Sequence, residues 1–218
     1  MDPAPADRPS IVTLAALHGT DGSVVGPRVA ERLGVEFLDR AISSAIAERT
    51  GLSEEAVAAV DDRPRRGVDR LVSNLARVAD STTATGRPVE RVDLEERRLR
   101  GELEEFLVRS SRAGGVVLGR GGAVVLASVP GALHVYLGGP RQGRIHRVME
   151  SEGVDRLTAE RRVDDNDRAR REYVREFYGV NGDDPGLYHL VVDAVALGVG
   201  ACVELIVLAS NHRTGSDR

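Results

Sequence analysis

Short apolar runs alternate with glycine-bearing loops and helical patterns along much of the chain. Residues 11–16 form an apolar, β-branched run typical of a buried strand, and a glycine-bearing loop at 17–23 follows it. Residues 24–33 then predict a helix that ends at Gly34, because glycine readily adopts the left-handed conformation that closes helices. Further strands are predicted at 35–39, 115–119, 132–137 and 190–193. Their continuous apolar character indicates an α/β fold with a parallel sheet covered on both faces.

The stretch between the second and third predicted strands is different, because its pattern is helical throughout. Helices are expected at about 41–49, 53–60 and 92–112. Between them, apolar residues at 68, 71, 72, 75 and 78 follow the spacing of one helical face. We therefore expect a helical insertion on a sheet core.

Two further helices are predicted between the last two strands, at 141–152 and at about 158–177. The second is almost wholly polar and rich in arginine and aspartate. A helix that is polar all round is not a core element, so this one predicts a solvent-facing lid or arm. The alternative is a solvated helix stabilised by ion pairs four residues apart. A closing helix is expected at 201–208, followed by a loose tail.

The charge balance narrows the possible partners. Thirty basic residues against 34 acidic ones give a net charge of −4, which argues against a nucleic-acid partner. Every basic residue is arginine, so lysine chemistry is either absent or performed by arginine. No apolar run approaches the roughly 20 residues of a membrane span, and no secretory signal is apparent. A cytoplasmic protein without a membrane partner is therefore expected.

Three isolated residues receive structural interpretations. His134, inside a predicted strand, is expected to be a core histidine with its hydrogen bonds satisfied. Asp193 could bind a nucleotide, but it is more simply explained as a cap for the loop that follows. Cys202, on an apolar helix, is expected to pack in the core.

Two glycine loops follow predicted strands and suggest phosphate binding. Gly19-Thr20-Asp21-Gly22 follows the first strand, and Gly119-Arg120-Gly121-Gly122 follows the strand at 115–119. A glycine loop before a helix directs backbone N–H groups and the helix N-terminus at an anion. In open α/β sheets, ligands bind beyond the carboxyl ends of the strands, where both loops would lie. The second loop could also be only a tight turn.

An ordered set of segments resembles the cytidylate kinase-like family over about residues 10–209. The segments are residues 11–40 with the Gly-Thr-Asp-Gly loop, Gly51-Leu52-Ser53-Glu54-Glu55, Asp62-Arg63-Pro64, Val117-Leu118-Gly119-Arg120-Gly121, Arg144-Ile145-His146-Arg147-Val148-Met149, Asp167-Arg168-Ala169-Arg170 with Tyr173, and Leu190-Val191-Val192-Asp193. The resemblance implies a P-loop NTPase-type parallel sheet sandwiched by helices. It also implies a monophosphate-binding insertion at about 52–98 and a lid at about 153–184. These would belong to a single domain at 11–209, between disordered tails at 1–10 and 210–218.

The same resemblance implies roles for particular residues. The loop residues Gly19, Thr20, Asp21, Gly22 and Ser23 would hold the phosphates of ATP, with Ser23 as a ligand of Mg²⁺. The acceptor and the transferring phosphoryl group would contact Asp39, Arg40, Arg120, Arg147, Asp167 and Arg170. Of these, Arg120, Arg147 and Arg170 are the expected catalytic residues, because phosphoryl transfer mainly needs positioning and positive charge.

The loop departs from the family pattern at several positions. The position of the usual P-loop lysine is Gly22, and Ala16 and Leu17 replace an arginine and a glutamate that the family commonly has. Asp21 places a carboxylate inside a loop that should receive polyphosphate. Pro27 disfavours a helix that starts at the loop, so the regular helix is expected to begin near Pro27.

Two classes of function therefore remain open. One is ATP-dependent phosphorylation of a nucleoside monophosphate, with CMP or dCMP as the first acceptor to consider. The other is a nucleotide-binding regulatory protein that has lost catalysis on the same fold. Another small phosphate-bearing acceptor is also compatible with the pattern, because a fold does not fix a substrate. The oligomeric state is not indicated.

Overall fold

The computed structural model describes residues 10–38, 101, 104–119 and 121–215. The chain divides into two compact units, residues 1–39 with 107–218 and residues 40–106. All the elements named below belong to the first unit. The predicted insertion at 52–98 lies outside the described residues, as do Asp39, Arg40 and Arg120.

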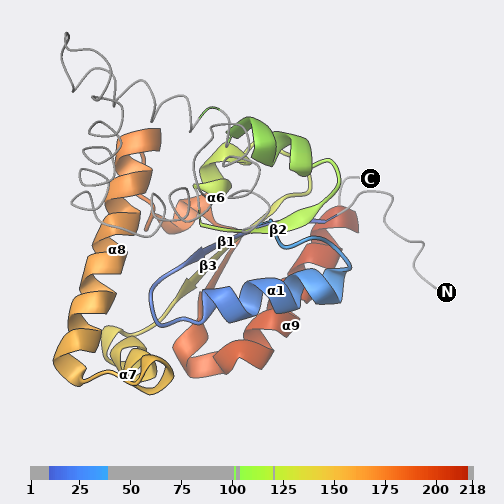
Figure 1. Cartoon of the computed structure of the whole chain (residues 1–218). Coiled ribbons are helices and arrows are strands. Elements are labelled where there is room, and N and C mark those ends of the chain that lie inside the picture. Colours follow the sequence, from blue (N-terminus) through green and yellow to red (C-terminus); the bar gives the residue numbers. More distant parts are fainter. Residues whose placement is uncertain (1–9, 39–100, 102–103, 120, 216–218) are drawn as a thin grey trace, which may run out of the picture. The chain divides into compact units, whose positions relative to one another are not determined.

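The core of the first unit is a parallel sheet of four strands in the order β2-β1-β3-β4 (Figure 1). The strands are β1 (Ile11–Ala16), β2 (Gly115–Leu118), β3 (Leu133–Gly138) and β4 (Leu190–Asp193). β1 lies centrally and pairs in parallel with both β2 and β3. The predicted α/β class is confirmed, as are the four strands expected at these positions.

The strand predicted at 35–39 is wrong as a regular element. Among the described residues, this segment forms a single parallel bridge between Phe37 and Val116, next to β2. The Val116 N–H donates to the Glu36 carbonyl at 2.8 Å. Leu38 is already helical and is buried at 2% exposure, with its side chain against the backbone of Gly115. The extended backbone therefore ends before Leu38, whose side chain is buried.

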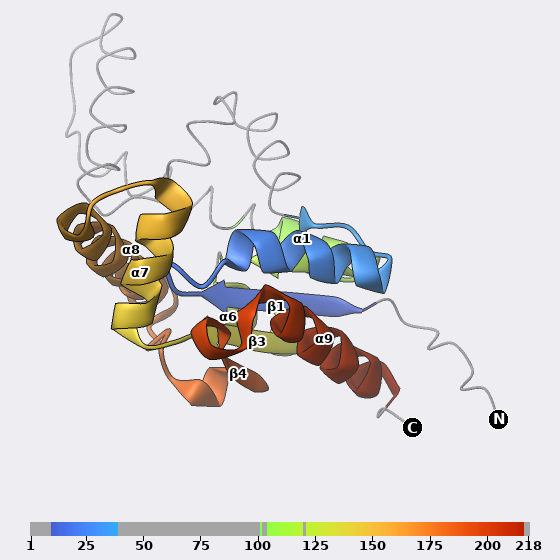
Figure 2. The same ribbon diagram turned by 90° about the horizontal axis from the view of Figure 1, so that it is seen from below.

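Helices cover both faces of the sheet. α1 (Gly22–Leu33) and α9 (Ala194–Gly215) lie side by side on one face (Figures 1 and 2). Their buried side chains join those of alternate strand residues in one core: Val12, Leu14, Val25, Val29, Val116, Val135, Leu137, Cys202, Val203 and Ile206. The short α6 (Gly122–Val125) lies on the other face, where Gly122 approaches Thr13 and Val117.

α9 differs from the expectation for the end of the chain. It runs to Gly215, so residues 210–215 are helical rather than a loose tail, although Gly198 interrupts its helical backbone (φ 74°, ψ 168°). The segment Ala194–Arg213, with a mean hydropathy of 1.9, is long and apolar enough to cross a membrane. This corrects the expectation that no apolar run approaches that length. Cys202 and Ile206 are buried against the sheet, whereas Leu197, Leu205 and Leu208 of the same helix are exposed.

α7 (Arg141–Glu152) and α8 (Arg156–Tyr178) lie beyond the carboxyl ends of β1 and β3 (Figure 1). Both predicted helices are confirmed. The expectation that the second one faces solvent on all sides is wrong, because Ala159 and Val163 are fully buried against Ile145 and Val148 of α7. Movement of residues 153–184 as a lid stays a prediction.

The predictions for the isolated residues are largely confirmed. Cys202 is buried in the core, and the Asp193 carboxylate accepts hydrogen bonds from the N–H groups of Val195 and Ala196 at the start of α9. His134 is 3% exposed, and its Nδ1 lies 2.9 Å from the Thr13 hydroxyl. Its Nε2 has no partner among the described residues, so this histidine is only half satisfied.

Candidate functional site

The loop between β1 and α1 is short and internally bonded. The Leu17 N–H donates to the Leu137 carbonyl at 3.0 Å. Thr20 is fully buried, and its hydroxyl donates to the Leu17 carbonyl at 2.6 Å. Gly19 has a φ of +80°, and a Cβ there would lie 2.6 Å from the Arg144 carbonyl oxygen. Gly19 is therefore required both by its backbone conformation and by the close approach of α7.

α1 begins directly at this loop, which corrects the expectation of a start near Pro27. Its first residue is Gly22, and the N–H groups of Val24 and Val25 both donate to the Asp21 carbonyl at 2.9 Å. Pro27 lies inside the helix and supplies no N–H for the Ser23 carbonyl. Burial of Val25 on the sheet side offsets that loss, since the first helical turn must be formed to place this side chain in the core.

The start of α1 is suited to an anion. The backbone N–H groups of Asp21, Gly22 and Ser23 have no acceptor among the described residues. Unbonded N–H groups and the helix dipole together favour negative charge at this point. Ser23 is exposed there, so its hydroxyl is accessible to a ligand.

Gly22 occupies a position that excludes any side chain. A Cβ at this residue would lie 2.5 Å from the Cβ of Ala16. The absence of a lysine here is therefore built into the packing between β1 and α1. Positive charge must reach the loop from another element.

Arg147 of α7 supplies positive charge at the loop. Its Nη1 lies 2.9 Å from Oδ2 of Asp21, and its Nη2 donates to the Val195 carbonyl at 3.0 Å. The two side chains of the pair are 22% and 30% exposed, so solvent reaches both. The structure thus brings together two of the predicted site residues, and the Asp21 carboxylate has a counter-ion.

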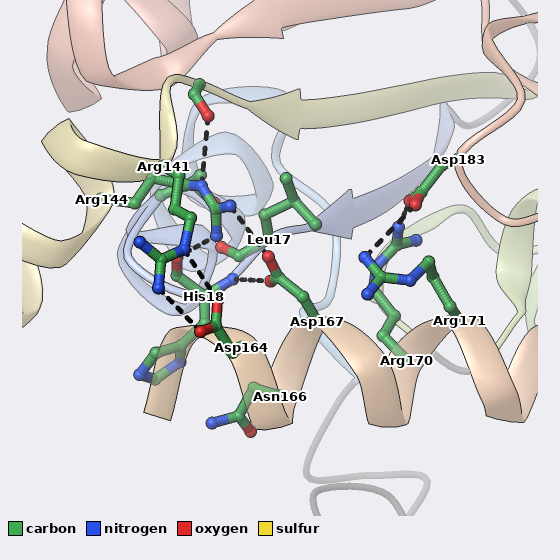
Figure 3. Close-up of polar contacts among 12 residues, drawn as sticks. Leu17, His18, Arg141, Arg144, Asp164, Asn166, Asp167, Arg170, Arg171 and Asp183 are labelled. Carbon is green, nitrogen blue, oxygen red and sulfur yellow. Dashed lines mark hydrogen bonds and ion pairs between the residues drawn. The ribbon is translucent and has the colours of Figure 1, made fainter. Parts of the chain in front are cut away.

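Arg144, one turn before Arg147, makes a buried set of contacts with the same loop (Figure 3). Its Nη2 lies 2.8 Å from Oδ2 of Asp167, and the two side chains are 6% and 9% exposed. Its Nη1 donates to the His18 carbonyl at 3.0 Å, and its Nε donates to the Gly139 carbonyl at 3.2 Å. Oδ1 of Asp167 accepts the His18 N–H at 3.2 Å. Asp167, a predicted site residue, is therefore next to the loop.

Sequence reasoning quoted Arg144 within a family segment but assigned it no role. One signal was present in the sequence. Arg144 directly precedes Ile145 and lies one turn before Val148, which are the buried residues of α7. A charged residue on that face needs a buried partner. The partner is on another helix, so the sequence of α7 alone does not reveal it.

Arg170 lies further along α8 in a separate polar cluster. Its Nη2 forms an ion pair with Asp183, which also accepts a hydrogen bond from the Tyr136 hydroxyl at 3.1 Å. The guanidinium carbon lies 5.2 Å from the centre of the Tyr136 ring. Burial raises the pKa of Tyr136 above its ordinary value, so the hydroxyl remains a donor at neutral pH. Figure 3 shows Arg170 and Arg171 both directed at Asp183.

No metal site is evident from side chains alone. The described residues contain no group of three or more His, Cys, Asp or Glu side chains that could hold an ion. The loop itself offers the Ser23 hydroxyl, as predicted, and the Asp21 carboxylate. These two oxygens fit a Mg²⁺ that is mainly bound by phosphates and water.

Comparisons with known proteins find relatives that cover this chain to different extents. A curated cytidylate kinase from Methanopyrus kandleri is 28% identical over 195 residues, covering 84% of this chain and 83% of that protein. A uronate isomerase from Corynebacterium glutamicum is 35% identical over 94 residues, which are 43% of this chain and 18% of that protein. A solved structure of an uncharacterised protein from Eubacterium ventriosum superimposes with a TM-score of 0.63 at 16% identity, covering 94% of this chain and 99% of that chain.

The match to a protein family is the most extensive of these findings. The model of the cytidylate kinase-like family matches residues 11–195, from the first residue of β1 to the start of α9. The matched region contains the whole parallel sheet and the glycine loop that follows its strand β1. Together the family and the cytidylate kinase relative support a kinase-type enzyme that binds nucleotides. The chain belongs to the cytidylate kinase-like family.

Proposed function

We propose that the protein transfers a phosphoryl group from ATP to a nucleoside monophosphate, with CMP or dCMP as the first acceptor. The observation that supports this most directly is the start of α1. Three N–H groups without an acceptor among the described residues lie beside Arg147, at the carboxyl end of the central strand. Phosphoryl transfer needs chiefly such positioning and positive charge around the phosphates.

The loop would hold the donor as Mg²⁺–ATP. The N–H groups of Asp21, Gly22 and Ser23 would bind phosphate oxygens, and the Ser23 hydroxyl would be a ligand of the metal. Magnesium supplies neutralisation of charge on the phosphates. Arg147 would exchange its contact with Asp21 for a contact with the transferring group, replacing the missing lysine as a bidentate donor.

The acceptor side rests on the family resemblance and on α8. Arg170 would contact the acceptor phosphate after leaving Asp183. The family resemblance also assigns acceptor roles to Asp39, Arg40 and Arg120, which lie outside the described residues. In the family, the position of Asp167 also serves the acceptor. Here its carboxylate already binds Arg144 and the His18 N–H, so it would have to give up both contacts to reach a base.

A second candidate function is a regulatory protein that binds nucleotides without turnover. The ion pair between Asp21 and Arg147 favours it, because a carboxylate at the anion-binding end of α1 opposes polyphosphate. The exclusion of a side chain at Gly22 favours it as well.

A coupled assay of ADP release separates the two functions. CMP, dCMP, UMP and AMP are each offered with Mg²⁺–ATP, and turnover above background with one of them supports the kinase. Thermal shift with the same nucleotides serves as the binding control, because a ligand that binds only the folded state raises the melting temperature. Stabilisation by CMP with no stabilisation by Mg²⁺–ATP and no turnover would favour the regulatory protein.

A further inference from the structure

We propose that Arg144 and Asp167 are positioning residues that hold the phosphate-binding loop in the shape that accepts ATP. This inference rests on the proposed function for its consequence in catalysis. Its structural part concerns only the free protein and can be tested without turnover.

His18, the residue before Gly19, is bound by both helices. Its N–H donates to Asp167 of α8, and its carbonyl accepts from Arg144 of α7. The two polar groups of one loop residue are therefore bound by two side chains from different helices. Those side chains are also bonded to each other at 2.8 Å. Displacement of either helix would then displace the loop.

Gly19 makes the contact between α7 and the loop still closer. The backbone of Arg144 is so near that a Cβ on Gly19 would lie 2.6 Å from the Arg144 carbonyl oxygen. Arg144 thus touches the loop both with its guanidinium and with its backbone. Beyond Thr20 the loop continues with Asp21, Gly22 and Ser23, whose N–H groups have no acceptor among the described residues and would bind the phosphates.

Association of α7 with α8 does not by itself require this buried pair. The two helices share an apolar contact at Ile145 and Val163. They also share a bidentate ion pair between Arg141 and Asp164, with distances of 2.8 and 2.7 Å. The latter side chains are 43% and 52% exposed, against 6% and 9% for Arg144 and Asp167.

The two ion pairs can be compared directly, because they occupy equivalent positions on α7 and α8. Arg141 precedes Arg144 by three residues, and Asp164 precedes Asp167 by three residues. Figure 3 shows Asp164 and Asp167 on the same side of α8. Of these two ion pairs, Arg144–Asp167 (the inner pair) bonds to the loop, whereas no contact with the loop is recorded for Arg141 or Asp164 in the described part of the chain. Burying an ion pair requires good geometry and further hydrogen bonds, which His18 and Gly139 provide.

Asp167 consequently serves the donor side of the site rather than the base of the acceptor. Its Oδ2 binds Arg144 and its Oδ1 binds the His18 N–H. Weakening this residue should therefore affect ATP more than the acceptor.

The test compares Asp167→Asn with Asp164→Asn in the full-length protein. The first variant keeps the shape of the side chain but removes the charge that holds Arg144. We expect hydrogen exchange at residues 17–25 to accelerate about tenfold, because hydrogen bonds to charged groups are lost there. Binding of a non-hydrolysable ATP analogue should weaken by a similar factor, and KM for ATP should rise with little change in KM for the acceptor. Asp164→Asn should leave all of these values near those of the wild type.

Two further variants protect the test against simple unfolding. Arg144→Met combined with Asp167→Leu replaces the ion pair by apolar side chains, which a buried site often tolerates. We expect this protein to keep the melting temperature within a few degrees while the loop exchanges as fast as in Asp167→Asn. Arg144→Lys retains the charge without the planar fork and should give an intermediate exchange rate.

Equal loop exchange in Asp167→Asn and Asp164→Asn would overturn the proposal. A loss of acceptor affinity with unchanged affinity for the ATP analogue would also overturn it. That result would indicate that Asp167 recognises the base of the acceptor. Absence of phosphoryl transfer by the wild type, with any acceptor, would overturn the proposed function instead. The exchange comparison would still decide the role of the inner pair.

Discussion

Two arginines of α7, one helical turn apart, contact the same loop but differ in burial and in the groups that they bind. Arg144 is buried and binds the loop through backbone groups and Asp167. Arg147 is partly exposed and binds the carboxylate of Asp21. Solvent can replace the partner of Arg147 at low cost, whereas loss of a partner at Arg144 leaves a buried charge unpaired. The comparison teaches that the buried arginine shapes the loop and the exposed one is available to a ligand.

The largest expected effect is on stability, from Arg144→Ala. Removing this guanidinium leaves Asp167 as an uncompensated buried carboxylate, which costs about 3–5 kcal/mol of unfolding free energy. Arg147→Ala breaks an ion pair that solvent reaches and should cost about 1 kcal/mol or less. Urea unfolding of both variants measures the difference. Equal losses would contradict the division of roles between the two arginines.

Acid should destabilise the opposite end of the sheet, away from both arginines. Burial, with smaller contributions from the neighbouring His189 and Arg213, lowers the pKa of His134 from 6.5 to about 4. The unfolded chain takes up a proton as the pH falls below about 6.5 while the folded protein does not, so stability falls between pH 6.5 and pH 4. The expected loss is about 3 kcal/mol.

His134→Gln provides the control for the acid effect. The variant removes the titrating group, so its unfolding free energy should fall less steeply than that of the wild type between pH 6.5 and pH 4. Identical slopes in urea titrations at several pH values would exclude His134 as the source.

The third effect concerns ligand affinity at Arg147. Arg147→Ala should weaken the ATP analogue about tenfold, because a charge-assisted contact with phosphate is lost. Affinity for CMP should change less than twofold. Calorimetry of both ligands measures this, with Arg141→Ala as a control for an arginine of α7 that pairs with Asp164 instead. Equal weakening of ATP and CMP would remove Arg147 from the donor side.

The smallest expected effect is from Asp21→Gly. Asp21 has a φ of 57°, a conformation that glycine adopts without strain. The change also removes a negative charge next to the phosphates, worth about 1 kcal/mol, and releases Arg147. ATP affinity should rise about three- to tenfold, less at high salt and high magnesium.

A double variant sharpens this last prediction. In an Arg147→Ala background, Asp21→Gly should give a smaller gain, since there is no arginine to release. An equal gain in both backgrounds would show that the two residues act independently. Weaker ATP binding by Asp21→Gly alone would identify Asp21 as a metal ligand or as a residue that orients the loop.

The sheet could be predicted from sequence because its strands are buried on both faces and therefore appear as continuous apolar runs. α8 was harder to predict. Its buried face contains Ala159, Val163 and Val174, but Asp167 lies on the same face and hides the pattern. A charged residue signals burial only when its partner is known, and that partner is on α7.

Some features of the candidate site could likewise be predicted from local sequence, and others could not. The glycines and the N-terminus of α1 are local features, so the position of the loop before α1 could be predicted from sequence. The structure places Arg147 next to this loop, and the roles of both in binding phosphate stay predictions. The start of α1 differs from the prediction because burial of Val25 outweighs the cost of Pro27 inside the helix. Asp39, Arg40 and Arg120 stay predictions, since they lie outside the described residues.

The contact between Gly22 and Ala16 has an evolutionary consequence. A mutation that introduced lysine at Gly22 would place its Cβ 2.5 Å from the Cβ of Ala16, and would disturb the packing before its amine could serve a phosphate. The residue at Ala16 would first have to become glycine, which by itself offers no benefit and weakens a strand. The two changes are epistatic. Lysine at Gly22 would therefore need a second change at Ala16, whereas an arginine on α7 brings positive charge to the loop without either change.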